Sequence, residues 1–197
     1  LITYYWAPAG GIVALRPLKT AKYLREYGWE PIVYTAKDPH YPSIDHSTEE
    51  DVPDDLTVLK NEIWEPYSIY KWITGQERDA NVNNIFYVEE SKTGWLHKLS
   101  VWIRSNFFIP DARAAWIRPS VRYLKDYLKD HPVDAIMSVG PPHTNTRIAT
   151  LLKRETGIPW LADFEDPWTQ VDYFKKLRLT SWGRKRHERM EQEAFDA

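Results

Sequence analysis

Cysteine is absent from the 197 residues, and no long apolar run is present. The lack of cysteine excludes disulfides and thiolate zinc sites, and it suits a reducing compartment. No apolar run approaches the roughly 20 residues that a membrane-spanning helix needs, and the first residues do not resemble a signal peptide. We therefore expect a cytoplasmic protein. Peripheral contact with the inner face of the cytoplasmic membrane stays open.

The small net charge of −2 hides two segments of opposite charge. Residues 37–62 contain eight acidic and two basic residues, a balance of −6, whereas residues 92–125 contain seven basic residues and one acidic residue, a balance of +6. Aromatic residues gather in and before the basic segment, namely Trp64, Tyr67, Tyr70, Trp72, Trp95, Trp102, Phe107, Phe108 and Trp116. Such a mixture suits sugar stacking, phosphate binding, a membrane surface or nucleic acid. Alternatively, the aromatics fill the core of a helical insertion and the cations form its wet face.

Short apolar runs alternate with amphipathic helical patterns along the chain. A short aromatic strand precedes Gly10 and Gly11, and these glycines open a helix that Gly28 ends. Along this helix apolar residues recur at three-residue spacing, at Leu15, Leu18, Ala21, Leu24 and Tyr27. Further strands are expected over 31–36, 56–63, 133–140 and 158–164, and a helix over 144–155. The pattern predicts an α/β fold, a single Rossmann-like domain whose parallel sheet has helices on both faces and a helical, aromatic-rich insertion.

Ligands of open α/β sheets bind beyond the carboxyl ends of the strands, so the residues that follow each strand are candidate site residues. At "PAGG", backbone N–H groups of Gly10 and Gly11 could face an anion, or the stretch is a plain tight turn. At "PPHTN", His143 could bond a hydroxyl or phosphate oxygen, or only support a helix start. At "DFEDPW", Asp163 and Asp166 could accept bonds from sugar hydroxyls or act as a base, or one of them could be a cap.

A fourth stretch and several missing motifs complete the candidate list. In "FFIPDAR", Pro110 breaks a helix before Asp111 and Arg113, which form either part of a site or a local salt bridge. "HERME" ends in Glu191 where a zinc protease motif needs histidine, and no serine elbow or P-loop lysine is present. The glycine pair is not the full dinucleotide fingerprint, so a dehydrogenase domain is a weaker alternative. We expect no metal and no cofactor.

The motifs together resemble a known family. "YYWAPAGG", "REYGWEPIVYT", "SVWIRSNFFIPDARAAWIRPS", "GPPH" and "DFEDPW" are similar to the N-terminal domain of bacterial glycosyltransferases of the GT-B fold, family 4, group 1. The resemblance runs from Leu1 to Ala197. It implies an enzyme of two Rossmann-like domains facing across a cleft, which transfers a sugar from a nucleotide-sugar donor to a glycan or lipid-linked acceptor with retention of configuration.

The resemblance also implies roles for the candidate residues. Gly10 and Gly11 match the loop that packs against the donor diphosphate. The candidate catalytic residues are His143, which matches a histidine that reaches the donor sugar, and Asp163 and Asp166. The acceptor side of the cleft is expected to hold Asp111, Arg113 and Trp168. The chain departs from the family at Glu165, where a basic residue is expected, and this weakens anion binding at that loop.

In this family, most donor contacts, including a carboxylate pair of the E-x7-E type, belong to a C-terminal domain that these residues do not include. We therefore expect residues 1–197 to be the acceptor half of the enzyme and to be catalytically silent alone, since the contacts to the leaving group would be missing. The alternative is a non-catalytic carbohydrate- or nucleotide-binding module. No nucleic-acid partner is expected.

Overall fold

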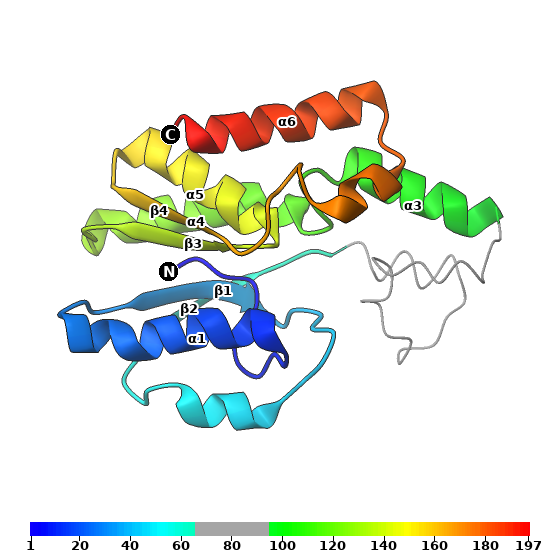
Figure 1. The fold of residues 1–197 in the computed structure, drawn as a ribbon. Helices are drawn as coiled ribbons and strands as arrows, with labels where there is room; N and C mark the ends of the chain where they lie inside the picture. Colours follow the sequence, from blue (N-terminus) through cyan, green and yellow to red (C-terminus); the bar gives the residue numbers. More distant parts are fainter. Residues whose placement is uncertain (66–94) are drawn as a thin grey trace.

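The structure, a computed structural model, describes residues 1–65 and 95–197 and shows a mixed α/β fold with parallel strands (Figure 1). In chain order its elements are α1 (Ile12–Leu24), η1 (Arg25–Tyr27), β1 (Ile32–Lys37), η2 (His46–Asp51), β2 (Thr57–Glu62), α3 (Trp95–Phe107), η4 (Ala114–Trp116), α4 (Ile117–Asp130), β3 (Ile136–Gly140), α5 (His143–Thr156), β4 (Trp160–Phe164), η5 (Asp172–Leu177) and α6 (Ser181–Phe195). The strands predicted over 31–36, 56–63, 133–140 and 158–164 and the helix over 144–155 are confirmed.

The strands form two parallel pairs that the N-terminal segment joins. β1 pairs with β2, and β3 pairs with β4. Ile2 forms parallel bridges to Tyr34 of β1 and to Ser138 of β3, so the N-terminal segment lies between the two pairs (Figure 1). The carboxyl ends of all these strands therefore point the same way, and the loops that follow them gather at one edge.

A strand was predicted before the glycine pair, and this prediction is wrong beyond the first residues. Pairing with the neighbouring strands ends soon after Ile2. Side chains supply the next hydrogen bonds instead. The Tyr41 hydroxyl accepts a bond from Trp6 N and donates one to the carbonyl of Tyr4, which also accepts one from Thr35 Oγ1, each at 3.2 Å. The chain thus leaves the sheet before it reaches α1.

Helix α1 buries only part of the stripe that a three-residue spacing predicts, namely Leu18 and Ala21. The buried residues are Ala14, Pro17, Leu18 and Ala21. This set follows the 3.6-residue turn of the helix, whereas a strict three-residue spacing drifts around its axis. Leu15 is accordingly exposed. The helix does end as predicted, because Gly28 caps η1 with φ 79° in the left-handed region that glycine adopts without strain.

Of the three apolar clusters among the described residues, two position α1, α4 and α5 against the strands. One cluster joins Leu18 and Ala21 of α1 to Val33 of β1. The larger cluster contains Tyr34 and side chains of α4 and α5, among them Ile148. Val33 and Tyr34 are consecutive residues of a strand, so their side chains leave it in opposite directions. The hydrophobic alternation of one short strand thus positions α1 separately from α4 and α5.

The aromatic residues of the basic segment divide between core and surface. Trp116 is fully buried, and its ring stacks on that of Tyr34 with centroids 5.2 Å apart and planes at 10°. Trp102 and Phe107 of α3 keep 37% and 67% of their surface exposed. The core interpretation therefore holds for Trp116, whereas a binding role for the exposed aromatics of α3 stays a prediction. Tyr67, Tyr70, Trp72 and Lys92 lie outside the described residues.

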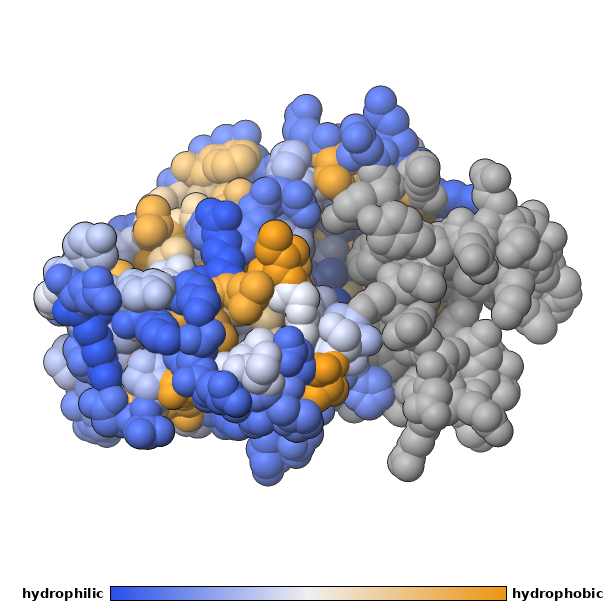
Figure 2. Space-filling view, turned by 60° about the horizontal axis from the view of Figure 1, so that its bottom comes forward, coloured by the Kyte–Doolittle hydropathy of each residue, from blue (hydrophilic) through white to orange (hydrophobic). Residues whose placement is uncertain are grey.

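The acidic segment is partly neutralised by α1. Asp51 accepts bonds from Lys19 Nζ at 2.6 Å and Lys22 Nζ at 2.5 Å, and Asp55 lies 2.6 Å from a guanidinium nitrogen of Arg25. The face of the molecule on which α1 and η2 lie is mainly hydrophilic (Figure 2). Within the described part of the chain, no helix is long and apolar enough to cross a membrane.

Candidate functional site

The candidate residues lie in loops that meet at the carboxyl edge of the strands. The stretch before α1 follows the N-terminal segment, residues 141–143 follow β3, and residues 165–168 follow β4. The last two loops run side by side, since Glu165 N donates to the carbonyl of Gly140 at 2.8 Å. The parallel direction of the strands thus brings together candidates that are far apart in sequence.

Gly10 and Gly11 have different roles at the start of α1. Gly10 N donates to Ser43 O at 2.9 Å, and a Cβ at Gly10 would lie 2.7 Å from Ser43 Oγ. Close approach of the chain at Ser43 therefore explains this glycine, and its N–H is already used. Gly11 has φ 87° and precedes a helix that has no side-chain cap. The predicted anion contact is thus left to the first N–H groups of α1, which have no partner within the helix, because the N–H of Ala14 already donates to Gly11 O at 3.2 Å.

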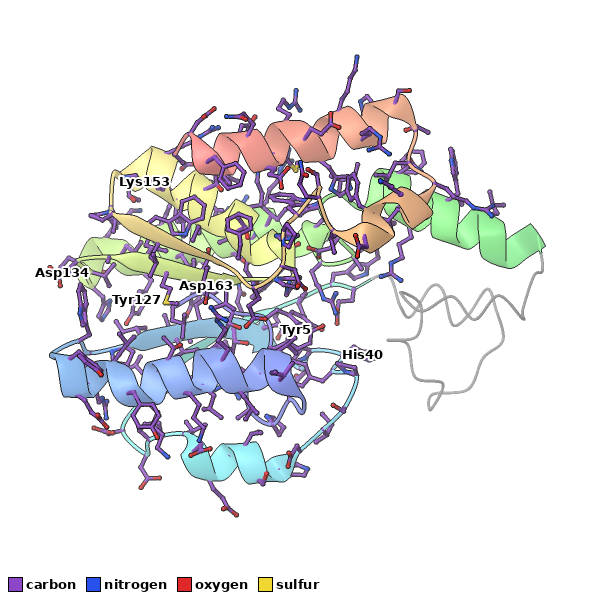
Figure 3. All side chains as sticks on the ribbon, in the orientation of Figure 1. Tyr5, His40, Tyr127, Asp134, Lys153 and Asp163 are labelled. Atoms are coloured by element: carbon purple, nitrogen blue, oxygen red, sulfur yellow. The ribbon has the colours of Figure 1, made fainter. Side chains whose placement is uncertain are left out.

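Asp163 forms an ion pair with α1 that the sequence did not predict. Its two oxygens accept bonds from Arg16 Nε at 2.7 Å and Nη2 at 2.9 Å, a bidentate geometry that joins β4 to the first turns of α1. Figure 3 labels Asp163 at the end of β4. The Asp163 carboxylate raises the pKa of Arg16, mainly through these hydrogen bonds. The side chain of Arg16 is 53% exposed, so a ligand can reach it.

Arg16 also lies beside Glu165, the position where a basic residue is expected, so one guanidinium is shared by two carboxylates. Its Nε lies 3.6 Å from Glu165 Oε1. Burial raises the pKa of Glu165, and Arg16 opposes that rise. A cation therefore stands beside this loop, although it comes from α1 and not from the loop itself.

His143 lies at the first position of α5 and is buried, with 8% of its surface exposed. Its ring stacks on that of Trp168, with centroids 4.5 Å apart and planes at 3°. Burial lowers the pKa of His143 to about 4, so the ring is neutral at physiological pH. Its Nδ1 has no hydrogen-bond partner among residues 1–65 and 95–197. A neutral imidazole offers one donor and one acceptor, which suits contact with a hydroxyl.

Trp168 is almost fully buried, with 3% of its surface exposed, and this corrects its predicted place on the acceptor side. Its Nε1–H donates to Nδ1 of His187 at 3.1 Å. Burial lowers the pKa of His187 to about 4 as well, which keeps Nδ1 free to accept this bond. The indole is therefore held between two imidazoles, and it orients His143 instead of facing an acceptor.

Asp111 caps the helix that begins with His143. Its Oδ2 accepts a bond from Thr144 N at 2.8 Å, and its Oδ1 accepts bonds from Thr144 Oγ1 at 2.8 Å and from Arg113 N at 3.0 Å. Both oxygens are thus engaged within the protein. These contacts make Asp111 a support of the α5 start, and its expected place on the acceptor side stays a prediction.

Arg113 forms no side-chain ion pair with Asp111, which corrects the local salt bridge considered above. Its guanidinium carbon lies 4.3 Å from the centre of the Tyr4 ring, and its Nε lies 3.5 Å from Glu65 Oε1. Arg113 is buried, with 5% of its surface exposed. This cation therefore supports the chain beneath the site and does not face solvent at the acceptor side.

Asp166 is exposed in the loop after β4 and forms no hydrogen bond with the part of the chain that the structure describes. Its carboxylate is therefore free to accept bonds from a ligand. Among these same residues, no group of three or more histidine, aspartate or glutamate side chains is arranged to hold a metal ion.

Three residues near the site were not recognised from the sequence, namely Arg16, Glu65 and His187. Glu65 accepts bonds from the Tyr4 hydroxyl at 2.9 Å and from His40 N at 3.0 Å. Nothing local distinguishes Arg16 from the other cations of α1. His187 could have been noticed, because the helical pattern of α6 places this single histidine on the buried side of the helix.

Comparisons of the chain with protein-family models, with curated proteins and with solved structures found no match.

Proposed function

We propose that this chain is the N-terminal, acceptor-side domain of a retaining glycosyltransferase of the GT-B fold. In the intact enzyme it moves a sugar from a nucleotide-sugar donor to a glycan or lipid-linked acceptor in the cytoplasm. One observation carries the proposal. The uncapped start of α1, the Arg16–Asp163 pair and neutral His143 lie on segments that follow three neighbouring parallel strands.

The arrangement of the strands supports a Rossmann-like domain. The N-terminal segment lies between β1 and β3. The chain leaves it through α1 toward the β1–β2 pair and later returns through α4 to the β3–β4 pair, whose two strands α5 connects. In such sheets, ligands bind in the crevice where the strand order reverses. Val33 and Tyr34, which enter different clusters, further support helices on both faces of the sheet.

The donor diphosphate would lie at the start of α1. Free N–H groups and the positive end of the helix dipole favour an anion there. A Cβ at Gly11 would meet nothing within 4 Å, so space is open beside this turn. Arg16 could exchange part of its bond to Asp163 for a phosphate oxygen, since its side chain is half exposed. Helix and guanidinium together would meet the diphosphate charge without a metal.

The transfer step requires little proton chemistry from the protein. The acceptor hydroxyl oxygen attacks the anomeric carbon on the face from which the donor phosphate leaves, and the departing phosphate oxygen takes the acceptor proton. His143 is neutral and would position the donor sugar through a hydrogen bond instead of acting as a base. Asp163 and Asp166 would accept bonds from acceptor hydroxyls.

The test is sugar transfer by the full-length gene product with a panel of radiolabelled nucleotide sugars. His143→Gln is expected to lower turnover or weaken donor binding, and His131→Gln, at the end of α4, serves as the control. Thermal unfolding of both variants shows whether the fold is kept. If His143→Gln is folded and leaves both turnover and donor affinity unchanged, the proposed role of this residue is wrong.

Residues 1–197 alone are expected to bind ligand weakly and to transfer no sugar. Time-dependent transfer by this purified chain would contradict the division of labour between two domains. If the full-length protein binds nucleotide sugars without transferring them to any acceptor, a non-catalytic binding module is the better explanation.

A further inference from the structure

A second basic segment contains exposed cations that take no part in the predicted site. Residues 175–189 contain seven basic residues and one acidic residue, a balance of +6. This segment covers the end of η5 and the first half of α6. Lys175, Arg184 and Lys185 are exposed, and none of them forms an ion pair with a described carboxylate. The cations of α1, in contrast, are paired with aspartates. The charge of this segment is therefore available to a partner.

An exposed apolar stripe lies on α3. Leu99, Trp102, Ile103 and Phe107 share one side of the helix, and they are 42%, 37%, 41% and 67% exposed. These four large apolar side chains lie together on one helix, whereas exposed apolar residues are usually scattered singly over a protein surface. Large apolar side chains gathered on one exposed helix mark sites of interaction.

The stripe and the basic segment form one surface. Asn106 of α3 accepts bonds through Oδ1 from Thr180 N at 2.7 Å and from Thr180 Oγ1 at 2.8 Å, and Thr180 is the N-cap of α6. Figure 1 shows α3 and the beginning of α6 at the same end of the molecule. Trp182, in the first turn of α6, is 56% exposed, and the guanidinium of Arg186 lies 5.2 Å from its ring. An exposed indole thus stands among the cations.

We propose that this surface binds an anionic phospholipid bilayer. The surface is formed by the exposed side chains of Leu99, Trp102, Ile103, Phe107, Lys175, Trp182, Arg184 and Lys185. Unpaired cations meet lipid phosphates, and tryptophan and aliphatic side chains enter the boundary between headgroups and acyl chains. Nucleic acid would match the cations but would leave the aliphatic stripe without a partner. This membrane proposal does not depend on sugar transfer by the chain, because none of the residues of the surface belongs to the candidate site.

Vesicle sedimentation tests the charge component. The chain is expected to bind vesicles of phosphatidylcholine mixed with phosphatidylglycerol and to stay in solution with phosphatidylcholine alone. The triple variant Lys175→Gln/Arg184→Gln/Lys185→Gln is expected to weaken binding by about a hundredfold, from the roughly fivefold that each cation near an anionic surface contributes. The matched control K60Q/R118Q/R122Q removes three exposed charges elsewhere. It is expected to change binding only a few-fold.

Trp182→Ala tests the apolar component. It is expected to weaken vesicle binding severalfold at fixed salt, whereas Trp29→Ala, which removes an indole of similar exposure, 49%, is expected to have no effect. Circular dichroism confirms that each variant is folded. Equal losses in the two charge triples, or equal binding to neutral and anionic vesicles, would overturn the proposal. A different pair of results would also overturn it. In that case the chain binds RNA tightly, the Lys175→Gln/Arg184→Gln/Lys185→Gln variant loses this binding, and Trp182→Ala leaves vesicle binding unchanged.

Discussion

Replacing Asp111 with alanine tests how the start of α5 is held. This carboxylate accepts three hydrogen bonds, two from Thr144 and one from Arg113 N. The residue at the N-cap position of α5 is Pro142, which has no side-chain hydrogen bond to the helix. Loss of a helix cap costs about 0.5–2 kcal/mol, and a buried donor left without a partner adds about 1–3 kcal/mol. Thr144 is fully buried, so we expect Asp111→Ala to lower the free energy of unfolding by about 2–4 kcal/mol.

Urea unfolding followed by circular dichroism measures this loss. Asp111→Asn keeps one accepting oxygen and should lose about half as much stability. Asp126→Ala is the control, because it removes an exposed aspartate whose partner is Lys129 on the same helix. We expect no measurable loss in this variant, since an exposed pair contributes little.

Loss of a helix cap costs at least about 0.5 kcal/mol. If Asp111→Ala lowers the free energy of unfolding by less than this, Asp111 is not the cap of α5. The enzyme assay shows whether Asp111 only supports the start of α5 or also contacts the acceptor. If Asp111 only supports the helix, the folded Asp111→Asn enzyme keeps its KM for the acceptor. A raised acceptor KM at unchanged stability would instead place Asp111 in contact with the acceptor, as the family resemblance implies.

Three further predictions concern pH, the core and the glycine turn. Burial lowers the pKa of His143 and His187 from 6.5 to about 4, so the folded state binds fewer protons than the unfolded state. Stability is therefore full above the unfolded pKa and is lost as the pH falls from about 6.5 toward 4, by up to about 3 kcal/mol per histidine, which urea midpoints measured across this range will show. Trp116→Ala removes a fully buried indole and should cost about 3–5 kcal/mol in thermal unfolding. Gly10→Ala places Cβ against Ser43 Oγ and should cost about 1–3 kcal/mol in urea unfolding, part of which Ser43→Ala restores.

Each of these predictions has a control. The fall in stability with acid should be smaller in the double variant His143→Gln/His187→Gln, and an unchanged slope would mean that other groups cause it. Trp182→Ala, at a half-exposed indole, should cost far less than Trp116→Ala. A Gly10→Ala chain with the wild-type urea midpoint would show that the loop at Ser43 moves aside without cost.

Local patterns in the sequence were sufficient for most of the elements. The apolar runs and turn residues predicted all four strands that the structure assigns, as well as the helix that begins near His143. The pattern was insufficient where tertiary contacts compete with it. The chain after Ile2 leaves the sheet because Tyr41 and Thr35 supply its hydrogen bonds, and no local signal announces these partners.

The candidate site was only partly predictable for the same reason. Local chemistry identified the glycine turn before α1 and the histidine at the start of α5, because special backbone conformations and helix starts have recognisable residues. The partners of Asp163 and Asp111 lie 147 and 33 residues away in the sequence, and spacing along the chain carries no information about them.

The sequence by itself thus determined the alternation of strands and helices, the place of the turn at Gly11 and the gathering of polar residues after strands. These features depend on hydrophobic period and local backbone preference, which neighbouring residues decide. Only the tertiary structure decided that Arg16 meets Asp163, that Trp168 is buried against His143 and that the basic start of α6 lies beside α3. Such pairings depend on how whole elements pack, because the side chains that meet come from segments distant in the chain.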